Sequence, residues 1–193
     1  VDILAHEDAI HEIEENSYTI LERMKSYNRD KAAGTEVVIP NKSFSEKSIF
    51  TLGDLEFHVL YLGPAHGPGD TQVWLPQLSL MIAGDMAFHE RMLPIFENTC
   101  TKCWLETWDE KFAPLNATYV IPGHGHPTNM AQVTRFTRDY LEDLRAKVLE
   151  VLDNGGDLAE AFYVDQERWR SLDTFEELAK RNAGRVFEEM EFE

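Results

Sequence analysis

The chain has 193 residues, which is enough for one domain or for one domain with a helical appendage. It carries 18 Lys and Arg against 35 Asp and Glu, a formal net charge of −17. Such a field repels polyanions, because nucleic-acid binding rests largely on basic side chains that neutralise phosphates. No run approaches the roughly 18 apolar residues of a membrane-spanning helix. We therefore expect neither a nucleic acid nor a membrane as a partner.

The cysteines and the first residues say little about the compartment. Two cysteines exclude a disulfide-rich scaffold. Cys100 and Cys103 have redox spacing, but neither a second pair nor a thioredoxin-like pattern accompanies them, so we interpret them as non-functional helix cysteines. Residues 1–7 lack the basic and long apolar regions of a signal peptide. The cytoplasm and the periplasm both stay open.

The first third of the sequence changes from a helix pattern to a strand pattern. Val1–Ala5 is short and apolar and predicts a strand. Asp8 is placed to cap a helix whose apolar residues recur at three- and four-residue steps until Gly34. A period of two follows, and Gly53–Asp54 has the composition of a hairpin turn. This alternation predicts strands over Glu36–Ile39, Ser48–Leu52 and Leu55–Leu62.

The rest of the sequence predicts further strands and then long helices. Asn129 and Gln132 have the spacing of a capping box, and Asp173 with Glu176 is placed to open the last helix. We expect the α/β class with layered α and β elements, in which helices flank a sheet. The predicted strands are Thr71–Leu75, Leu78–Ala83 and Ala117–Ile121, and the predicted helices cover residues 100–113, 129–154 and 173–190.

Three loops that each follow a predicted strand carry a metal-competent side chain beside glycine. They are Gly63–Asp70 with His66, Ala83–Asp85, and Pro122–Pro127 with His124. A sheet holds such loops rigidly while their side chains converge, and imidazole and carboxylate suit zinc and similar ions. Each loop alone is more often an ordinary turn. Their combination, in this order and strand context, predicts a metal site.

These loops resemble motifs of the metallo-β-lactamase superfamily of metallohydrolases. The resemblance implies the later part of that family's αββα fold over residues 1–127 and a helical C-terminal extension, packed on it, over residues 128–193. The similar segments are Pro64–Asp70, Val73–Pro76, Met81–Asp85, Pro122–Gly125 and Asn182–Phe187.

One motif of that family is absent from the chain. No segment reads His-x-His-x-Asp-His, because His124-Gly-His126 is followed by Pro127. In family members the motif lies upstream of a segment like Val1–Glu7. The resemblance therefore implies the C-terminal portion of a metallohydrolase without its first strands. Loss of strands that cover a sheet exposes apolar surface and strand edges, so we expect a homo-oligomer.

The resemblance also implies roles for three residues. His66 and His124 ligate zinc and Asp85 bridges two ions, with one or two ions in the intact parent and one or none in this chain. Metal-activated water then hydrolyses a small-molecule ester, thioester, lactone, lactam or phosphodiester. We expect this chain alone to have little or no activity. The alternative is a non-catalytic metal-binding or oligomerising fragment.

The remaining histidines and the tryptophans have simpler interpretations. His89 is a candidate substrate contact, and His126 is a candidate for that role or for replacing His124 as a ligand. We expect the other histidines, His6, His11 and His58, to be structural or solvent-exposed. We interpret the four tryptophans as core or interface residues: Trp74, Trp104, Trp108 and Trp169.

Overall fold

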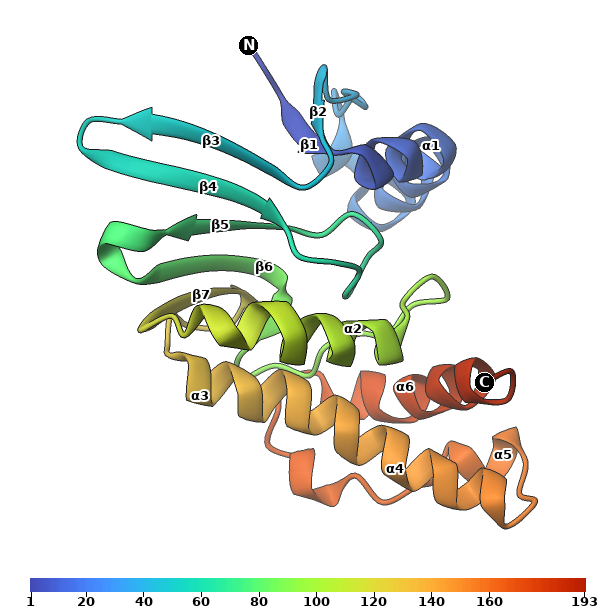
Figure 1. Cartoon of the computed structure of the whole chain (residues 1–193). Coiled ribbons are helices and arrows are strands. Elements are labelled where there is room, and N and C mark those ends of the chain that lie inside the picture. Colours follow the sequence, from blue (N-terminus) through green and yellow to red (C-terminus); the bar gives the residue numbers. More distant parts are fainter.

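The computed structural model describes residues 1–193 and contains two sheets (Figure 1). The smaller sheet is a parallel pair, and the larger one has the order β3-β4-β5-β6-β7. All pairs in the larger sheet are antiparallel except β6 with β7, which is parallel. The strands are β1 (Leu4–His6), β2 (Lys42–Phe44), β3 (Lys47–Leu52), β4 (Leu55–Tyr61), β5 (Thr71–Leu75), β6 (Leu80–Phe88) and β7 (Tyr119–His124).

Five of the six helices gather at the β7 end of the large sheet, whereas α1 lies with β1 and β2 at the other end (Figure 1). The expected α/β class, a sheet flanked by helices, is confirmed. None of these helices has the length and apolar character needed to cross a bilayer. The helices are α1 (Glu7–Asn28), α2 (Thr101–Thr107), α3 (Met130–Val133), α4 (Asp139–Asp153), α5 (Leu158–Ala161) and α6 (Phe175–Met190).

The hairpin and the long second helix form where their local signals predicted them. Six Cα pairs, from Lys47↔Leu60 to Leu52↔Leu55, join β3 and β4 around the Gly53–Asp54 turn. The Asn129 side chain accepts a hydrogen bond from the backbone N–H of Gln132 at 3.1 Å and so caps α3. A π-helical turn over Thr134–Arg138 joins α3 to α4, which makes one rod of the two helices.

Two predictions near the N-terminus are wrong. Glu36–Ile39 has no strand, because β1 pairs instead with β2, and Pro40 has no N–H to donate to a ladder. The N-cap of α1 is His6 and not Asp8, since His6 Nδ1 accepts the Asp8 backbone N–H at 3.2 Å. His6 is buried and its Nε2 lies 2.8 Å from the carbonyl of Ser45, which confirms a structural role.

The start of the last helix also differs from the prediction. Its N-cap is Thr174, in the left-handed region at φ 65°, and no side chain caps it. Asp173 is occupied elsewhere, because its backbone N–H donates to the carbonyl of Glu90 and its carbonyl accepts from Met92, both at 3.0 Å. Asp173 thus ties the helical region to the segment that follows β6.

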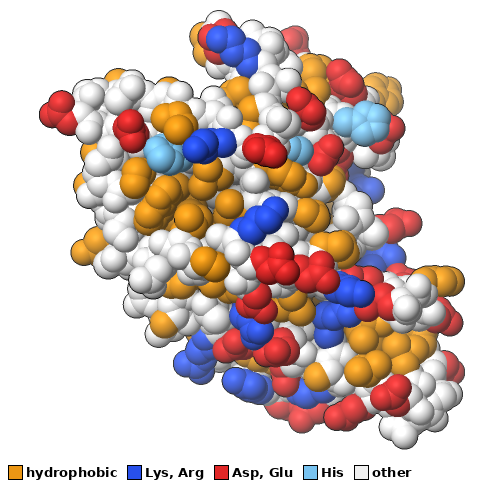
Figure 2. Space-filling model, in the orientation of Figure 1, with side chains coloured by type: hydrophobic (Ala, Val, Ile, Leu, Met, Phe, Trp, Pro, Cys, Tyr) orange, Lys and Arg blue, Asp and Glu red, His pale blue; other side chains and the backbone are white.

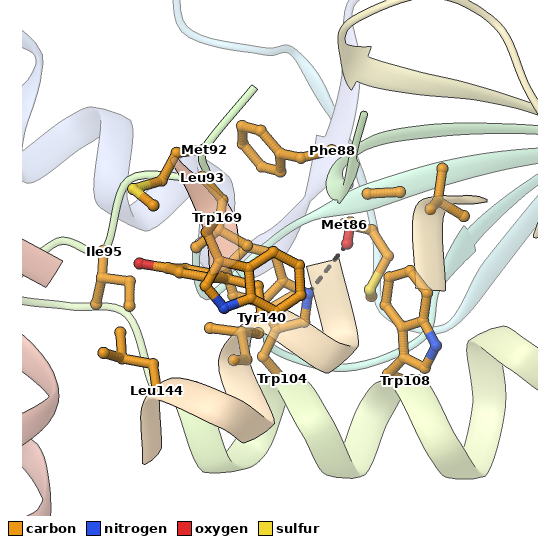
Figure 3. Packing of buried hydrophobic residues seen from close by; sticks show 14 of the residues in the cluster. Met86, Phe88, Met92, Leu93, Ile95, Trp104, Trp108, Tyr140, Leu144 and Trp169 are labelled. Carbon is orange, nitrogen blue, oxygen red and sulfur yellow. Dashed lines mark hydrogen bonds between the residues drawn. The ribbon is translucent and has the colours of Figure 1, made fainter. Parts of the chain in front are cut away.

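One hydrophobic cluster of 26 buried residues runs from Ala65 to Phe187. Trp104, Trp108 and Trp169 lie inside it, as expected (Figure 3). Trp74 is partly buried and packs against it. The indole N–H of Trp104 donates to the carbonyl of Met86 at 3.0 Å and so anchors α2 to β6. The cluster draws on residues before and after position 127, and a domain division at that position stays a prediction.

The large sheet has one covered face and one open face. Met81, Ala83 and Val120 are fully or almost fully buried, whereas their neighbours Ile82 and Ile121 are each 37% exposed. Hydrophobic side chains gather over the strands in the space-filling view, whereas charged side chains of both signs cover the C-terminal helices (Figure 2). Apolar faces of this kind favour association.

We predict that the chain forms a dimer or larger assembly at micromolar concentration. Phe50 is 49% exposed on the edge strand β3 and stacks on Phe57 at 4.9 Å between ring centroids. Phe50→Lys should weaken association about tenfold or more, because it places a charge on an apolar contact. The matched variant Tyr18→Lys, which changes an aromatic residue that is 75% exposed on α1, should leave association unchanged. Light scattering that shows a monomer would contradict the prediction.

A buried amide joins the last helix to the segment after β6. Asn182 is fully buried, its Oδ1 accepts the Ile95 N–H at 3.0 Å, and its Nδ2 donates to the Leu93 carbonyl at 2.7 Å. The same Nδ2 lies 2.9 Å from the hydroxyl of Tyr140, which in turn donates to Gln166. Burial raises the pKa of Tyr140, so this hydroxyl keeps its proton.

Replacing this amide should be costly. Asn182→Ala leaves a buried N–H and a buried carbonyl without partners, and we expect it to lower the free energy of unfolding by about 3 kcal/mol. Asn154→Ala removes a hydrogen bond to the Glu150 carbonyl at an exposed helix end and should cost about 0.5 kcal/mol. Urea unfolding measures both, and equal losses would contradict the proposed role of Asn182 in the fold.

Candidate active site

The parallel pairing of β6 with β7 brings two of the predicted site residues together. Phe88 and His124 are Cα partners at the end of the pair, and their rings stack at 5.1 Å. The register shifts between Ile82 and Gly84, where Gly84 adopts φ 55°, a conformation that favours glycine. This irregularity turns the following residue, Asp85, out of the regular alternation.

His66, Asp85 and His124 converge, but not from three loops as predicted: His66 lies in a loop, whereas Asp85 is inside β6 and His124 is the last residue of β7. His66 Nδ1 lies 3.9 Å from Asp85 Oδ2, and His124 Nε2 lies 3.7 Å from Asp85 Oδ1. Each imidazole therefore faces a different oxygen of one carboxylate. The Asp85 side chain is 34% exposed, so the cluster can be reached from solvent.

The space around Asp85 is shaped for its carboxylate. A Cβ added at Gly123 would overlap Asp85 Oδ1, so glycine is required where β7 passes this side chain. The loop that carries His124 is closed by a pair of backbone hydrogen bonds between Val120 and Thr128, at 2.9 and 2.8 Å. Both features fix the carboxylate relative to His124.

These distances bear on whether a metal ion fits between the side chains. Two ligands of one tetrahedral zinc ion lie about 3.4 Å apart, and the two observed separations are wider by a few tenths of an ångström. No group of three or more His, Cys, Asp or Glu side chains is close enough to hold a metal ion. Nε2 of His66 is buried without a hydrogen-bond partner. The donor types and the glycine cradle fit a divalent cation, for which this chain supplies an incomplete ligand set.

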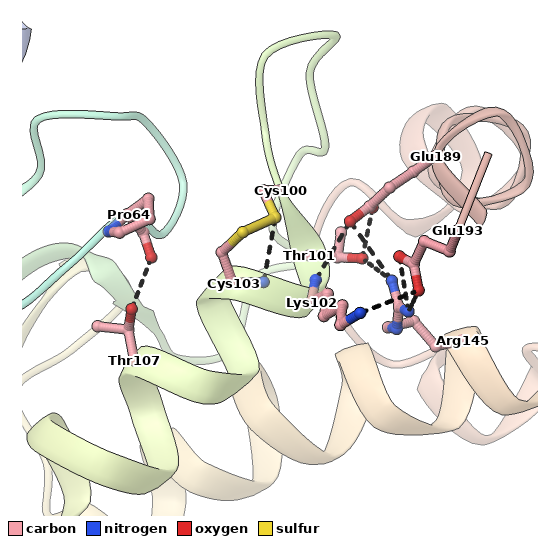
Figure 4. The surroundings of a disulfide bond; sticks show 9 residues. All are labelled: Pro64, Cys100, Thr101, Lys102, Cys103, Thr107, Arg145, Glu189 and Glu193. Atoms are coloured by element: carbon pink, nitrogen blue, oxygen red, sulfur yellow. Dashed lines mark hydrogen bonds and ion pairs between the residues drawn. A yellow bond between two sulfur atoms is a disulfide. The ribbon is translucent and has the colours of Figure 1, made fainter.

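The segment that leads into α2 supports the His66 loop. Thr99 Oγ1 donates to the carbonyl of His66 at 2.8 Å, and Thr107 Oγ1 donates to that of Pro64 at 2.9 Å (Figure 4). The rings of Phe96 and Trp104 meet the His66 ring edge-on at 5.2 and 5.9 Å. His66 is thus held by one continuous stretch of chain.

The cysteines of this stretch lie at the start of a helix, as we expected, and they are bonded to each other, which we did not predict. Cys100 and Cys103 form a disulfide across the first turn of α2 (Figure 4). Cys100 is also the N-cap of α2, and its Sγ accepts the Cys103 N–H at 3.1 Å. The sequence did not predict this bond, because no second cysteine pair accompanies Cys100 and Cys103 to indicate a redox motif.

His89 and His126 lie beside the site and engage other partners. His126 Nδ1 lies 2.6 Å from Glu90 Oε2, a hydrogen bond that raises the pKa of His126 and lowers that of Glu90. His89 Nδ1 lies 2.9 Å from the carbonyl of His126. Neither ring forms a hydrogen bond or ion pair with Asp85. Their role as substrate contacts stays a prediction.

Sequence reasoning missed two charged residues next to the site. Burial raises the pKa of Asp70, whereas a 2.9 Å hydrogen bond from the Gly67 N–H and the nearby His66 act in the opposite direction. A guanidinium nitrogen of Arg91 lies 3.2 Å from Nδ1 of His124. Asp70 ends a quoted motif and could have been suspected. Arg91 gave no sequence signal, because the bridge of its backbone to Asp173 is what places it.

Comparisons with known proteins show what this chain is similar to. No family model matches the chain. A curated metallo-β-lactamase type 2 from Bacteroides fragilis is 27% identical over 99 residues, which are 50% of this chain and 40% of that protein. The chain is thus similar in sequence to a metallo-β-lactamase over half of its own length. The superfamily resemblance of its loop motifs is thereby confirmed.

Two solved structures share the fold of this chain. The inverting sec-alkylsulfatase Pisa1 from a Pseudomonas species has a TM-score of 0.70 and 18% identity, over 97% of this chain and 36% of that one. A metallo-β-lactamase family protein from Thermus thermophilus has a TM-score of 0.61 and 17% identity, over 100% of this chain and 67% of that one. The chain thus spans less than half the length of the first relatives it matches.

We predict that Gly123→Ala disturbs Asp85 directly. The added methyl group overlaps the carboxylate, so the variant should lose about 2 kcal/mol of unfolding free energy. Gly155→Ala is the matched control, because Gly155 has φ 71° but no atom within 4 Å of an added Cβ, and it should lose about 1 kcal/mol through backbone strain alone. Urea unfolding of both variants measures the difference, and a smaller loss for Gly123→Ala would count against the cradle.

Proposed function

We propose that this chain carries part of the metal site of a zinc-dependent hydrolase, with His66 and His124 as ligands and Asp85 as the bridge between two ions in the whole protein. The observation that carries the proposal is that two imidazoles face the two oxygens of one carboxylate, at 3.9 and 3.7 Å. Superfamily relatives support a metallohydrolase in general.

The chain's own residues would hold the metal ion and orient its ligands. A bound divalent cation would lower the pKa of a water molecule and polarise a substrate oxygen. Asp85 must be ionised and both histidines neutral for these side chains to act as ligands. Phe88 fixes the His124 ring by stacking, and Thr99 fixes the loop of His66 through its carbonyl. Pre-set ligands of this kind reduce the cost of ordering the site.

The substrate class is a small molecule with a bond that activated water can cleave. We propose an ester, thioester, lactone, lactam or phosphodiester, as the superfamily resemblance implied. An alkyl sulfate belongs in the same test, since an alkylsulfatase shares the fold over 97% of this chain. The acidic chain, with its net charge of −17, disfavours a polyanionic substrate.

One observation favours a second function, a non-catalytic metal-binding or oligomerising unit. No group of three or more ligating side chains is close enough to hold an ion, and a catalytic zinc commonly has three protein ligands. With two imidazoles and one carboxylate, a bound ion would keep several waters and lack the fixed geometry that positions a nucleophile.

Zinc titration of the 193-residue chain tests the proposed site. We expect one weak site or none, and where the wild type binds measurably, its affinity should fall at least about tenfold in Asp85→Ala, because a carboxylate shared by both imidazoles is lost. Asp70→Asn and His126→Ala serve as comparison variants that change neighbouring groups. Equal binding by wild type and Asp85→Ala would contradict the assignment of Asp85.

A hydrolysis assay with the same chain separates the two functions. We expect little or no turnover of the ester, lactone, phosphodiester and alkyl sulfate panel. Adding a segment with the missing His-x-His-x-Asp-His ligands should restore turnover, which chelators and Asp85→Ala should then abolish. Chelator-sensitive turnover by this chain alone would show that the absent ligands are dispensable, and no turnover after restoration would favour the non-catalytic unit.

A further inference from the structure

Arg91 is a cation beside the site without an acidic partner. One of its terminal nitrogens, Nη1, lies 3.2 Å from Nδ1 of His124. Its Nε is buried and has no hydrogen-bond partner, and no carboxylate lies within ion-pair distance of its guanidinium. In a chain with 35 acidic residues, an arginine that faces a histidine instead of a carboxylate calls for an explanation.

The contact determines which nitrogen of His124 carries the proton. A guanidinium has five N–H donors, no acceptor, and does not lose its proton in proteins. Nδ1 of His124 must therefore be the acceptor, which leaves the ring proton on Nε2. Nε2 is the atom that faces Asp85 Oδ1 at 3.7 Å, so an N–H points toward the carboxylate.

This tautomer is the wrong one for a metal ligand at Nε2. A metal binds the lone pair of an imidazole nitrogen, and the other nitrogen then donates its N–H to an acceptor such as a carboxylate or carbonyl. With Nε2 as the ligand, Nδ1–H would face the N–H groups of Arg91, two donors with no acceptor between them. The Arg91 hydrogen bond and a metal at Nε2 therefore exclude each other.

The ring of His124 and the backbone of Arg91 are both held in place. The His124 ring stacks on Phe88 with 22° between the planes. The backbone of Arg91 is bridged to Asp173, and the neighbouring Met92 N–H donates to the Asp173 carbonyl at 3.0 Å. Only the side chain of Arg91 can withdraw while the ring stays in place.

We propose that Arg91 is a positioning residue that holds His124 in its Nε2–H tautomer in the metal-free chain and competes with the metal for it. The competition rests on the proposed role of His124 as a ligand. Metal binding at His124 then requires that the Arg91 guanidinium leave Nδ1.

The first test reads the tautomer without any metal. In the ¹⁵N-histidine-labelled, metal-free chain, long-range proton–nitrogen correlation spectra should show His124 as the Nε2–H tautomer. Arg91→Lys keeps a donor and should keep that tautomer. Arg91→Gln offers an amide oxygen that accepts from Nδ1–H, so the Nδ1–H tautomer should become populated. An Nδ1–H tautomer in the wild type, or no change in Arg91→Gln, would overturn the proposal.

The second test measures zinc affinity by competition with a coloured chelator. Arg91→Gln should bind zinc about tenfold more tightly than the wild type, because a charge-assisted hydrogen bond no longer competes. Arg91→Lys should stay close to the wild type. Arg168→Gln is the matched control, since Arg168 lies over the Trp169 ring and loses the same charge away from the site. Unchanged affinity in Arg91→Gln, or an equal gain in Arg168→Gln, would overturn the competition.

A third variant distinguishes this inference from the proposed function. If His124→Ala binds zinc as tightly as the wild type, His124 is no ligand and the competition is overturned with it. The tautomer spectra of the metal-free chain still decide, on their own, whether Arg91 holds His124.

Discussion

The pairing of β6 with β7 is the constraint on which the candidate site depends. These strands form the one parallel pair of the large sheet, so both end at the same edge, and the residues at their ends meet there. The register shifts at Gly84 free Asp85 from the regular pleat, and Gly123 leaves room for its carboxylate. His66 joins them only because α2, anchored to β6 through Trp104, supports its loop.

The C-terminal helices act on this edge from a distance. Asn182 on α6 binds the backbone of Leu93 and Ile95, and the backbone of Asp173 pairs with the segment around Arg91. Both contacts fix the chain just after β6. They offset the conformational entropy that these loop residues lose when they become ordered. The final helices are therefore part of what positions Arg91 against His124, even though none of their side chains faces Asp85.

The features that sequence predicted are those with a local cause. The β3–β4 hairpin and the Asn129 cap follow from turn residues and capping side chains, and the approach of His66, Asp85 and His124 was predicted although Asp85 and His124 lie in strands and not in loops. The wrong predictions concern segments whose structure depends on a partner that is distant in the sequence. Asp173 pairs with Arg91 instead of capping α6, and β1 pairs with β2, whereas Glu36–Ile39 forms no strand. Arg91 itself acquires meaning only from contacts across the fold.

These contacts also explain how the proposed ligands can fold close together without a metal. The carboxylate of Asp85 would be a poorly compensated charge in a partly buried site, and the N–H of His124 that Arg91 enforces points at it. On the other side, His66 faces the second oxygen. A bound cation would replace the histidine contacts that already compensate the charge of Asp85. The free energy gained on binding would therefore be the difference between two states in which this carboxylate is compensated. The proposed site should therefore bind metal more weakly than its ligand count suggests, and its affinity should depend on Arg91, which does not touch the metal.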